Sequence, residues 1–401
     1  MNFATPAALL APCSCYPSSS TMLAKSKEPT TMVASIDENT SHRTSSYTVA
    51  KPWVDLADLE AAVVADWDPG VRAFIQEGAG TGRAVAANRA AHAKWALRSR
   101  VLVDVSKIDT STGVLGQRVS LPVLVAPSGL HTLVHPEGEV ATATGCSEAG
   151  TIMILSSGTG RTMDDVRATG AHTWFQLYWH DRDRTRELVN QAADVGFTAV
   201  CFTVDMPVRP LLGASMRTGV ARVAGQTPLY LLPRDAHLTG GDWDHDARLT
   251  WKDLEWLREI CPLPIVLKGI MAADDARLAQ ESGVDAVVVS NHGGRSLDAP
   301  WGTLDALPEI VDAISDSGSS GMQVYVDGGF RHGSEVLVAL ALGADAVLVG
   351  RPALWGLSVG GAQGVRDVLQ VLGRQLTSCM GMVGARSVAE IDSSRVRRVS
   401  E

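Results

Sequence analysis

Residues 264–290, PIVLKGIMAADDARLAQESGVDAVVVS, contain two short apolar runs, Pro264–Gly269 and Asp285–Ser290, on either side of a segment with helical spacing, Ala273–Ser282. A continuous apolar run is typical of a strand that is buried on both faces of a parallel sheet. An amphipathic helix between two such runs covers one of those faces. This stretch therefore predicts a strand–helix–strand unit of a parallel sheet.

The same unit recurs along the chain. Further apolar runs occupy Leu121–Ala126, Thr151–Ser156, Thr173–Tyr178, Thr198–Asp205, Gln323–Asp327 and Asp345–Gly350, and helical spacing returns at Asp183–Asp194 and Ser334–Leu342. Together with the first two runs they make eight strands, which fit a closed (β/α)8 TIM barrel of the α/β class better than an open doubly wound sheet.

Other segments are predicted around this barrel. From Pro52 to about Asn88 the pattern is helical, and Asp55 can cap the first helix of this N-terminal helical segment. The polar stretch 209–249 predicts a long loop over the C-terminal face after strand four. A helix over roughly 361–384 closes the body. We therefore expect a tail at 1–50 that is disordered, a barrel domain at 51–390 and a C-terminal tail at 391–401.

Composition limits the classes of function. Of the 401 residues 45% are hydrophobic and 20% charged, which excludes global disorder. No run of 18 apolar residues occurs, so an ordinary transmembrane helix is excluded. The net charge is −9 and the Lys and Arg residues are scattered. This balance argues against nucleic acid and against an anionic membrane as partners.

The cysteines and the N-terminal tail bear on location. The six cysteines include no CxxC pair, which favours a reduced, cytoplasmic setting. Residues 4–11 are mildly apolar, but no Lys or Arg precedes them and two prolines interrupt them, which makes a poor secretory signal. A targeting role and a start codon placed too early are the alternatives for this tail. Cys13 and Cys15 are only a weak hint of a metal, and no metal site is predicted.

Polar residues close all eight predicted strands. They are Ala126-Pro127-Ser128, Ser156-Ser157, Gln176 with Tyr178, Thr203 with Asp205, Lys268, Ser290-Asn291-His292, Asp327-Gly328-Gly329 and Gly350-Arg351. A single polar residue at a strand end is often only a helix cap, but eight such ends are hard to explain in that way. Because the active site of a parallel barrel lies at the C-terminal strand ends, we expect it here.

The last two strand ends predict a phosphate site. Asp327-Gly328-Gly329 precedes a helix and offers free backbone N–H groups, and Gly350-Arg351 adds further N–H groups and a bidentate cation. A DGG sequence alone is a common turn. The loops after strands seven and eight are, however, where this fold usually binds phosphate.

Two titratable groups stand out among the strand ends. Lys268 could be a Schiff-base nucleophile, a member of a structural ion pair, or a positive charge beside an electron-accepting ring. His292 could be a base whose second nitrogen is held by Asp205. Its alternative is a core histidine satisfied by a backbone carbonyl, which the nearby Asp205 and Arg295 make less attractive.

Residues 52–390 resemble the FMN-dependent α-hydroxy acid oxidases and dehydrogenases, a family that includes glycolate oxidase, lactate oxidase and mandelate dehydrogenase. The resemblance rests on motifs that occur in order: Ala126-Pro127-Ser128, His135-Pro136-Glu137-Gly138-Glu139, Leu155-Ser156-Ser157, Phe175-Gln176-Leu177-Tyr178, Thr203-Val204-Asp205, Leu267-Lys268-Gly269, Ser290-Asn291-His292-Gly293-Gly294-Arg295, Asp327-Gly328-Gly329 and Gly350-Arg351-Pro352. The run SNHGGR together with the order of the strands makes the match highly specific.

The resemblance implies an FMN cofactor and a role for each matched residue. His292 would be the base, supported by Asp205, while Arg295 would bind the substrate carboxylate and Tyr178 the substrate oxygen. Lys268 would stabilise negative charge on the reduced flavin. FMN contacts are implied at Pro127, Ser128, Gly129, Ser156, Gln176, Thr203, Lys268, Ser290, Asp327, Gly328, Gly329, Arg331, Gly350 and Arg351, of which the last positions from Asp327 onward hold the ribityl and phosphate end. The resemblance also implies a homo-oligomer, a tetramer.

Three positions depart from the family pattern. Phe74 stands where the family usually has a carboxylate-binding tyrosine, and Leu212 stands where it has an arginine. Arg209 could compensate for that arginine. Gly158 replaces a bulky aromatic residue of glycolate oxidase.

We therefore expect oxidation of an α-hydroxy acid, or a related α-hydroxy carbonyl compound, that is bulkier than glycolate or lactate. O2 is the expected electron acceptor. One alternative is a flavin enzyme that tailors a larger or masked substrate, with or without decarboxylation. The other is a barrel kept as a non-catalytic scaffold.

Overall fold

The computed structural model describes residues 55–208, 212–213, 229–230, 247–315 and 321–399. By its internal contacts the chain divides into Met1–Ser46 and Tyr47–Glu401. The first unit lies outside the described residues. All helices and strands given below belong to the second unit.

The strands are β1 (Trp95–Leu97), β2 (Thr112–Val114), β3 (Gln117–Val119), β4 (Val123–Val125), β5 (Ile152–Ser156), β6 (His172–Leu177), β7 (Val200–Thr203), β8 (Ile265–Ile270), β9 (Ala286–Val289), β10 (Gln323–Asp327), β11 (Ala346–Val349) and β12 (Val396–Arg398). The α-helices are α1 (Leu56–Val64), α2 (Pro69–Gln76), α3 (Arg83–Ala93), α4 (Glu139–Ala149), α5 (Met163–Arg167), α6 (Arg182–Val195), α9 (Trp251–Ile260), α10 (Ala273–Glu281), α11 (Thr303–Ser315), α12 (Gly333–Ala341) and α13 (Arg351–Val383). Short 3-10 turns lie at His131–Leu133, Val388–Glu390 and Ser393–Arg395.

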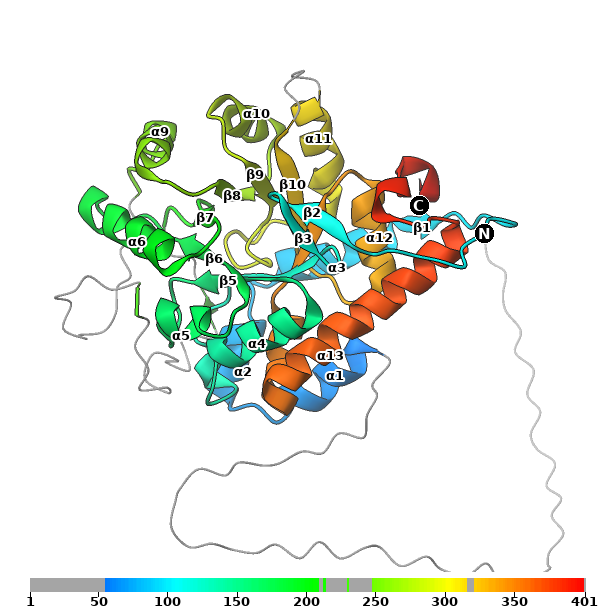
Figure 1. Cartoon of the computed structure of the whole chain (residues 1–401), viewed down its shortest axis with the longest axis horizontal. Coiled ribbons are helices and arrows are strands. Elements are labelled where there is room, and N and C mark those ends of the chain that lie inside the picture. The colour runs from blue at the N-terminus through cyan, green and yellow to red at the C-terminus, as the bar shows by residue number, and fades with distance from the viewer. Residues whose placement is uncertain (1–54, 209–211, 214–228, 231–246, 316–320, 400–401) are drawn as a thin grey trace, which may run out of the picture. The chain divides into compact units, whose positions relative to one another are not determined.

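Eight parallel strands form a closed barrel, in the order β10-β11-β4-β5-β6-β7-β8-β9. Helices surround these strands, as Figure 1 shows. Each strand coincides to within one residue with one of the eight apolar runs singled out in the sequence or falls inside it, so the predicted (β/α)8 barrel is confirmed. The apolar runs are continuous because side chains on both faces of these strands are buried.

Two groups of buried side chains lie on the two faces of the barrel wall. The inner group includes Leu124, Ile154, Trp174, Val288 and Tyr325. The outer group packs the strands against the surrounding helices. The barrel interior is therefore a filled core, and only its ends are open to ligands.

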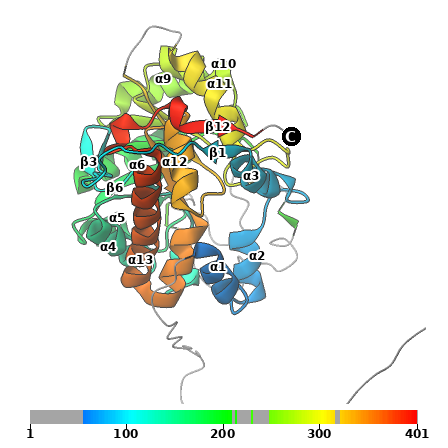
Figure 2. The same ribbon diagram turned by 90° about the vertical axis from the view of Figure 1, so that its right-hand side faces the viewer.

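The N-terminal helical segment begins as predicted. The Asp55 carboxylate accepts a hydrogen bond from the Ala57 N–H and caps α1. Asp68 caps α2 through the Gly70 N–H at 2.7 Å, and Pro69 occupies the first helical position, where its missing N–H costs nothing. Helix α1 packs on α13, which Figure 2 shows along one side of the barrel beside α12.

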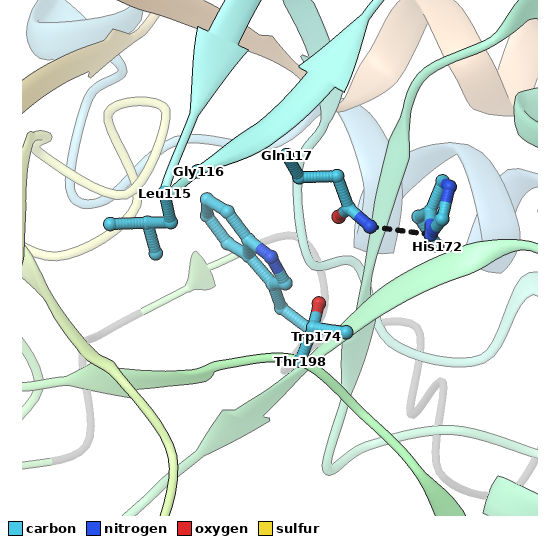
Figure 3. Close-up of a pocket in the computed structure, with 6 residues that line it drawn as sticks. All are labelled: Leu115, Gly116, Gln117, His172, Trp174 and Thr198. Atoms are coloured by element: carbon cyan, nitrogen blue, oxygen red, sulfur yellow. Dashed lines mark hydrogen bonds between the residues drawn. The ribbon is translucent and has the colours of Figure 1, made fainter.

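A hairpin of β2 and β3 covers the N-terminal end of the barrel. Val114 and Val119 pack into the inner core, and the Leu115 N–H donates to Gln323 at the start of β10. A pocket of about 390 Å³ lies at this end, lined by Leu115, Gly116, Gln117, His172, Trp174 and Thr198 (Figure 3). Its residues come from the β2–β3 hairpin, the first half of β6 and the segment before β7, so it lies opposite the predicted active site.

The chain after the barrel packs back onto it. Helix α13 has non-helical backbone at Gly360 and Gly361, and its second half coincides with the predicted closing helix. After it, β12 pairs antiparallel with β1. Among the described residues, no helix is both long enough and apolar enough to cross a membrane.

Candidate active site

His292 and Asp205 form a hydrogen-bonded pair at the C-terminal end of the barrel. His292 Nδ1 lies 2.9 Å from Asp205 Oδ1. The other ring nitrogen, Nε2, lies 3.3 Å from the Tyr178 hydroxyl, and the two rings are stacked. Residues from β6, β7 and β9 thus meet at one point, as the sequence predicted for a base and its orienting carboxylate.

The charge of Asp205 sets the tautomer of His292. Burial alone would raise the pKa of Asp205, but the charges of His292 and Lys268 and the hydrogen bond from His292 outweigh it and lower this pKa. An ionised carboxylate only accepts hydrogen bonds, so Nδ1 carries the proton. Nε2 is then the proton-accepting nitrogen, and it faces the site. Burial first, and then the Asp205 charge, raises the pKa of the Tyr178 phenol, which therefore stays protonated.

Lys268 is buried in a second polar group. Its ammonium donates to Ser290 Oγ at 2.9 Å and lies 3.3 Å from Asp327 Oδ2. The Ser290 hydroxyl in turn donates to Asp327 at 2.8 Å and accepts from the His292 N–H at 3.1 Å. Burial by itself would lower the pKa of Lys268, but Asp327 and Asp205 outweigh it and raise this pKa. A permanent cation with a carboxylate partner is a poor Schiff-base nucleophile, so that alternative loses support.

Several buried polar atoms at this end have no hydrogen-bond partner among the described residues. They are Gln176 Nε2, Thr203 Oγ1, Asp205 Oδ2 and Asp327 Oδ1, at or just after the ends of β6, β7 and β10. An unsatisfied buried polar group costs about 1–3 kcal/mol. Two donors and two acceptors at one end of a barrel indicate a polar ligand with groups of both kinds. The ring carbonyls and nitrogens and the ribityl hydroxyls of a flavin supply such groups.

Two guanidiniums beside this region have no carboxylate partner in the described part of the chain. Arg295 donates to the carbonyls of Phe74 and Glu77. Arg351 donates to the carbonyls of Ile75, Gly293 and Glu77 at 3.0 to 3.3 Å. Burial lowers the pKa of both groups, and for Arg351 the neighbouring Arg295 lowers it further. Both environments are therefore suited to an added anion.

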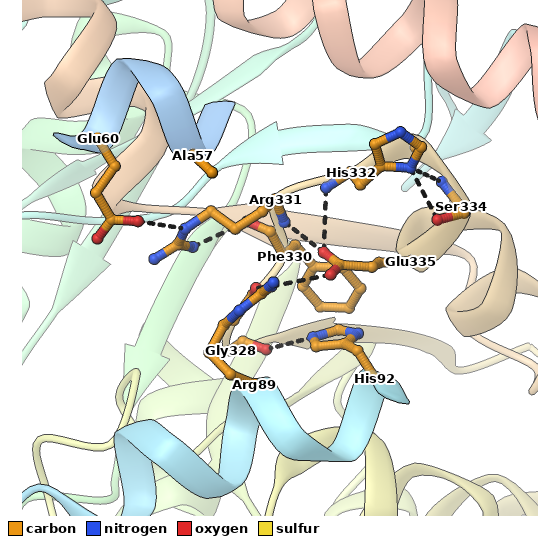
Figure 4. Close-up of polar contacts among 12 residues, drawn as sticks. Ala57, Glu60, Arg89, His92, Gly328, Phe330, Arg331, His332, Ser334 and Glu335 are labelled. Carbon is orange, nitrogen blue, oxygen red and sulfur yellow. Dashed lines mark hydrogen bonds and ion pairs between the residues drawn. The ribbon is translucent and has the colours of Figure 1, made fainter. Parts of the chain in front are cut away.

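The residues of the predicted phosphate grip lie around the ends of β10 and β11. Arg331 lies with its guanidinium 4.5 Å from the Trp355 ring centroid and 3.4 Å from Glu60. Figure 4 shows it between α1 and the turn after β10. Gly328 and Gly329 have φ of 104° and 87°, in the region that favours glycine. A Cβ at Gly350 would lie 3.5 Å from Ser128 Oγ, so the ends of β11 and β4 face each other. These residues fit an FMN phosphate and ribityl chain.

The remaining predicted contacts also lie at this end. Gln176 Oε1 accepts from Ser156 Oγ at 3.2 Å, and Ser156 Oγ accepts from the Gly158 N–H at 3.0 Å. Pro127, Ser128 and Gly129 directly follow β4 and are partly exposed. A Cβ at Gly129 would lie 3.4 Å from the Gly158 carbonyl oxygen, so these two glycines pack backbone against backbone.

On the substrate side of the site, the structure describes Phe74, Gly158 and Leu212. Phe74 lies with its ring centroid 5.4 Å from the Arg295 guanidinium. Gly158 is buried and accepts a hydrogen bond from the Leu130 N–H at 2.9 Å. Leu212 is partly exposed. Arg209 lies outside the described residues, so its role stays a prediction.

Sequence reasoning missed two residues of α3 and its surroundings. Asn88 is 2% exposed and exchanges hydrogen bonds with Asn291, next to His292. Asp298 accepts hydrogen bonds from the N–H groups of Thr81 and Arg83 at 2.8 and 2.7 Å, and so caps a helix 215 residues away in sequence. The only local signals were an asparagine inside a helix and a glycine, Gly82, where a capping side chain is usual. No cluster of three metal-binding side chains occurs among the described residues.

A (β/α)8 barrel that carries a histidine–aspartate pair, a buried lysine and two guanidiniums with no ion pair among the described residues at its C-terminal end is suited to an enzyme that binds an anionic cofactor there. The comparisons agree with that class. Residues 65–398 match the FMN-dependent dehydrogenase family. The chain is 43% identical over 348 residues to the L-lactate oxidase of Nostoc sp., covering 80% of this chain and 92% of that protein.

Two further similar proteins are named for mandelate or 4-hydroxymandelate, which are aromatic α-hydroxy acids. The 4-hydroxymandelate oxidase of Amycolatopsis orientalis is 40% identical over 347 residues, covering 84% of this chain and 96% of that one. A solved structure of mandelate oxidase with (S)-4-hydroxymandelic acid is 39% identical, covers 86% of this chain and 98% of its own, and has a TM-score of 0.78. The chain therefore belongs to the FMN-dependent dehydrogenase family, and the resemblance inferred from its motifs is confirmed. It is an oxidoreductase that uses FMN to oxidise α-hydroxy acids.

Proposed function

We propose that this enzyme oxidises an α-hydroxy acid with a larger, apolar side chain, such as an aryl group, in preference to glycolate or lactate, and that O2 accepts the electrons. The observation that carries the proposal is the contact between Arg295 and Phe74. The guanidinium that would bind the substrate carboxylate lies 5.4 Å from the centroid of a phenyl ring, which offers apolar surface and no hydroxyl.

Other observations support the same substrate class. Gly158 has no side chain beside Ser156, where glycolate oxidase carries a bulky aromatic residue. Leu212 offers no charge where the family pattern has an arginine. Relatives named for mandelate and 4-hydroxymandelate match nearly the whole barrel. A relative named for L-lactate is comparably similar, so a direct comparison of substrates must decide between the two classes.

The described residues divide the work of the reaction. Bound FMN supplies the two-electron acceptor. His292 Nε2 takes the proton from the substrate, and Asp205 stabilises the imidazolium that forms. Arg295 binds the carboxylate, and the Tyr178 hydroxyl donates to the substrate oxygen. Lys268 holds a positive charge beside the flavin ring, with Asp327 as its fixed partner.

The same proposal assigns the cofactor contacts. Pro127, Ser128, Gly129, Ser156, Gln176, Thr203 and Ser290 would hold the flavin ring and ribityl chain. Asp327, Gly328, Gly329, Arg331, Gly350 and Arg351 would hold the ribityl and phosphate end. Gln176, Thr203 and Asp327 each bring a buried polar atom that needs a partner, and Arg351 brings a cation that needs an anion.

Anaerobic flavin bleaching tests the proposed reaction. The purified yellow protein is mixed with racemic mandelate without oxygen, and the flavin absorbance is followed. We expect bleaching, and then return of the oxidised spectrum with formation of H2O2 when O2 is admitted. Bleaching that only an artificial acceptor reverses would contradict the assignment of O2. Formation of benzoate, CO2 and water in place of the keto acid and H2O2 would favour the decarboxylating alternative.

Two further expectations concern the molecule in solution. We propose a homo-oligomer, a tetramer, which light scattering of the holoenzyme can measure.

A cytoplasmic location is likewise proposed, and a fluorescent fusion at the C-terminus would test it. Some of the relatives are named as peroxisomal, so that compartment is the outcome that would overturn the expectation.

A further inference from the structure

Helix α3 reaches the turn that carries His292 through a pair of buried amides. Asn88 Nδ2 donates to Asn291 Oδ1 at 2.8 Å, and Asn291 Nδ2 donates back to Asn88 Oδ1 at 2.9 Å. The two side chains are 2% and 8% exposed. A reciprocal pair of this kind fixes the orientation of both amides, because rotating either one would bring two donors or two acceptors together.

Other groups use most of the remaining hydrogen-bonding capacity of the pair. Asn291 Oδ1 accepts a second bond from the Gly294 N–H at 2.9 Å, and Asn291 Nδ2 donates to the Trp301 carbonyl at 3.2 Å. Asn88 Oδ1 accepts from the Thr303 N–H at 3.2 Å. The bond to Gly294 closes a turn across His292 and Gly293. A network whose members are each held by several hydrogen bonds is rigid, and it loses that rigidity when one member is removed.

His292 needs such support because its backbone is unusual. Its φ is 60°, in the left-handed region that a residue with a side chain seldom occupies. The hydrogen bond from the His292 N–H to Ser290 Oγ holds one side of the residue, and the Asn291 turn holds the other. The backbone conformation aims the imidazole between Asp205 and Tyr178.

A second contact joins the same two segments. Asp298, in the loop that follows His292, caps α3 through Thr81 and Arg83. The Ala79 N–H donates to the Gly294 carbonyl at 2.9 Å. The loop from Asn291 to Asp298 is therefore attached to α3 and the residues before it at several points.

We propose that Asn88 is a positioning residue for the reaction. It fixes Asn291, which holds the turn around His292, and so it keeps the imidazole aligned with the substrate without touching substrate or flavin. This inference rests on the role proposed for His292 as the base. The N-terminal helical segment, which lies outside the barrel strands, would then take part in the chemical step.

The test is the limiting rate of flavin reduction in FMN-loaded Asn88→Ala and Asn88→Asp, measured anaerobically at saturating mandelate. Asn88→Asp keeps the volume and replaces the donor with a second acceptor, so it covers the case in which Asn88→Ala does not fold. Misplacement of a catalytic group by about 1 Å can cost on the order of 100-fold in rate. We expect a fall of about 10- to 100-fold in the limiting rate, and a smaller change in FMN dissociation constant. A limiting rate within twofold of the wild type in a folded variant would overturn the proposal.

His92→Ala is the matched control. His92 lies one turn along α3, is 7% exposed, and bonds the Gly328 carbonyl at 3.1 Å, next to the predicted phosphate grip (Figure 4). It makes no hydrogen bond to the His292 turn. Its loss should weaken FMN binding more than it slows the loaded enzyme. An equal fall in the limiting rate of this variant would mean that any damage to α3 slows the reaction.

A double-mutant cycle separates positioning from general destabilisation. If Asn88 acts through Asn291, the variant lacking both amides should be no slower than Asn291→Ala alone. If the rate losses of the two single variants multiplied in the double variant, Asn88 would not act through Asn291. Failure of the proposed base would look different, because His292→Ala would then reduce flavin at the wild-type rate. A slow His292→Ala with an unaffected Asn88→Ala would refute this inference alone.

Discussion

Asp205 Oδ1 lies 2.9 Å from His292 Nδ1, and this contact leaves His292 Nε2 as the nitrogen that can accept a proton. Asp205 comes from the end of β7 and His292 from the end of β9. The two are 87 residues apart in sequence and meet because β8 is the only strand between theirs in the barrel.

Replacing His292 with alanine should remove the base and spare the cofactor. We expect flavin reduction by mandelate to slow by on the order of 10²–10⁴-fold, the usual contribution of a positioned base. FMN should remain bound, because the nearest predicted flavin contacts, Ser290 and Lys268, keep their bond to each other. Anaerobic stopped-flow absorbance measures the rate. Loss of FMN in place of loss of rate would mean that His292 is structural.

Asp205→Asn should slow the same step through the tautomer of His292. The amide can present a donor to Nδ1, which would move the ring proton to Nε2 and block proton acceptance. We expect a fall of on the order of 10²–10⁴-fold in the limiting rate of flavin reduction. Asp274→Asn on α10 is the matched control, since this carboxylate is 92% exposed and pairs only with Arg277 on its own helix among the described residues. A limiting rate that Asp205→Asn leaves unchanged would show that the pair does not set the protonation of the ring.

Lys268→Met should damage both the fold and the flavin environment. Breaking a buried ion pair strands the remaining charge, here Asp327, at a cost of about 3–5 kcal/mol. The loss of a cation beside the ring should also lower the FMN affinity or the flavin reduction potential. Thermal unfolding and a redox titration measure these effects. Lys94→Met is the control, because its ion pair with Asp305 is part-exposed and worth about 0–1 kcal/mol. Unchanged affinity and potential would refute the place assigned to Lys268.

The cap that Asp298 provides for α3 should depend on pH. Hydrogen bonds from the side chain and backbone of Thr81 lower the pKa of Asp298. A group whose pKa is lowered by folding stabilises the protein above its unfolded pKa, about 3.9, and loses that contribution as the pH falls through the folded value. The wild type should therefore be more stable than Asp298→Asn at neutral pH, and the difference should shrink below about pH 4. Urea unfolding at pH 7 and pH 3 measures it, and a difference that stays constant between these two pH values would contradict the role of the carboxylate.

The fold was predictable because its signals are local. The apolar run at 285–290 and the helical spacing at 273–282 are each complete within one window, and buried strands of a parallel sheet have no polar face to blur them. The strand ends were predictable for a related reason. A lysine near the end of a buried strand, such as Lys268, or a histidine shortly after one, such as His292, is expected at the C-terminal end of the barrel.

The supporting contacts were not predictable, because they join residues that are distant in sequence. Asn88 and Asn291 are 203 residues apart, and nothing in either local pattern names the other. The same holds for Asp298 and the start of α3. Arg331 and Arg351 were expected to hold phosphate, but their contacts with Glu60 and with the carbonyls after α2 depend on how the N-terminal helices dock.

Two replaced residues on the substrate side of the site predict which substrates the enzyme prefers. Two residues expected to grip a small carboxylate are replaced by Phe74 and Leu212, and a charge-assisted hydrogen bond is worth about 1.5–3 kcal/mol. At about 1.4 kcal/mol per decade, glycolate and lactate should each bind about tenfold or more weakly per lost contact. An aryl group can recover affinity against apolar surface at roughly 25 cal/mol per Å² buried.

The most direct measurement is kcat/KM for mandelate, 4-hydroxymandelate, lactate and glycolate with the same preparation of holoenzyme. We predict that kcat/KM for both aryl substrates exceeds that for lactate and glycolate by about tenfold or more, at roughly 1.4 kcal/mol per decade. A value for glycolate or lactate equal to or above that for mandelate would contradict it. In that event a loss of activity toward the small acids in Arg209→Ala would show that this arginine restores the carboxylate contact.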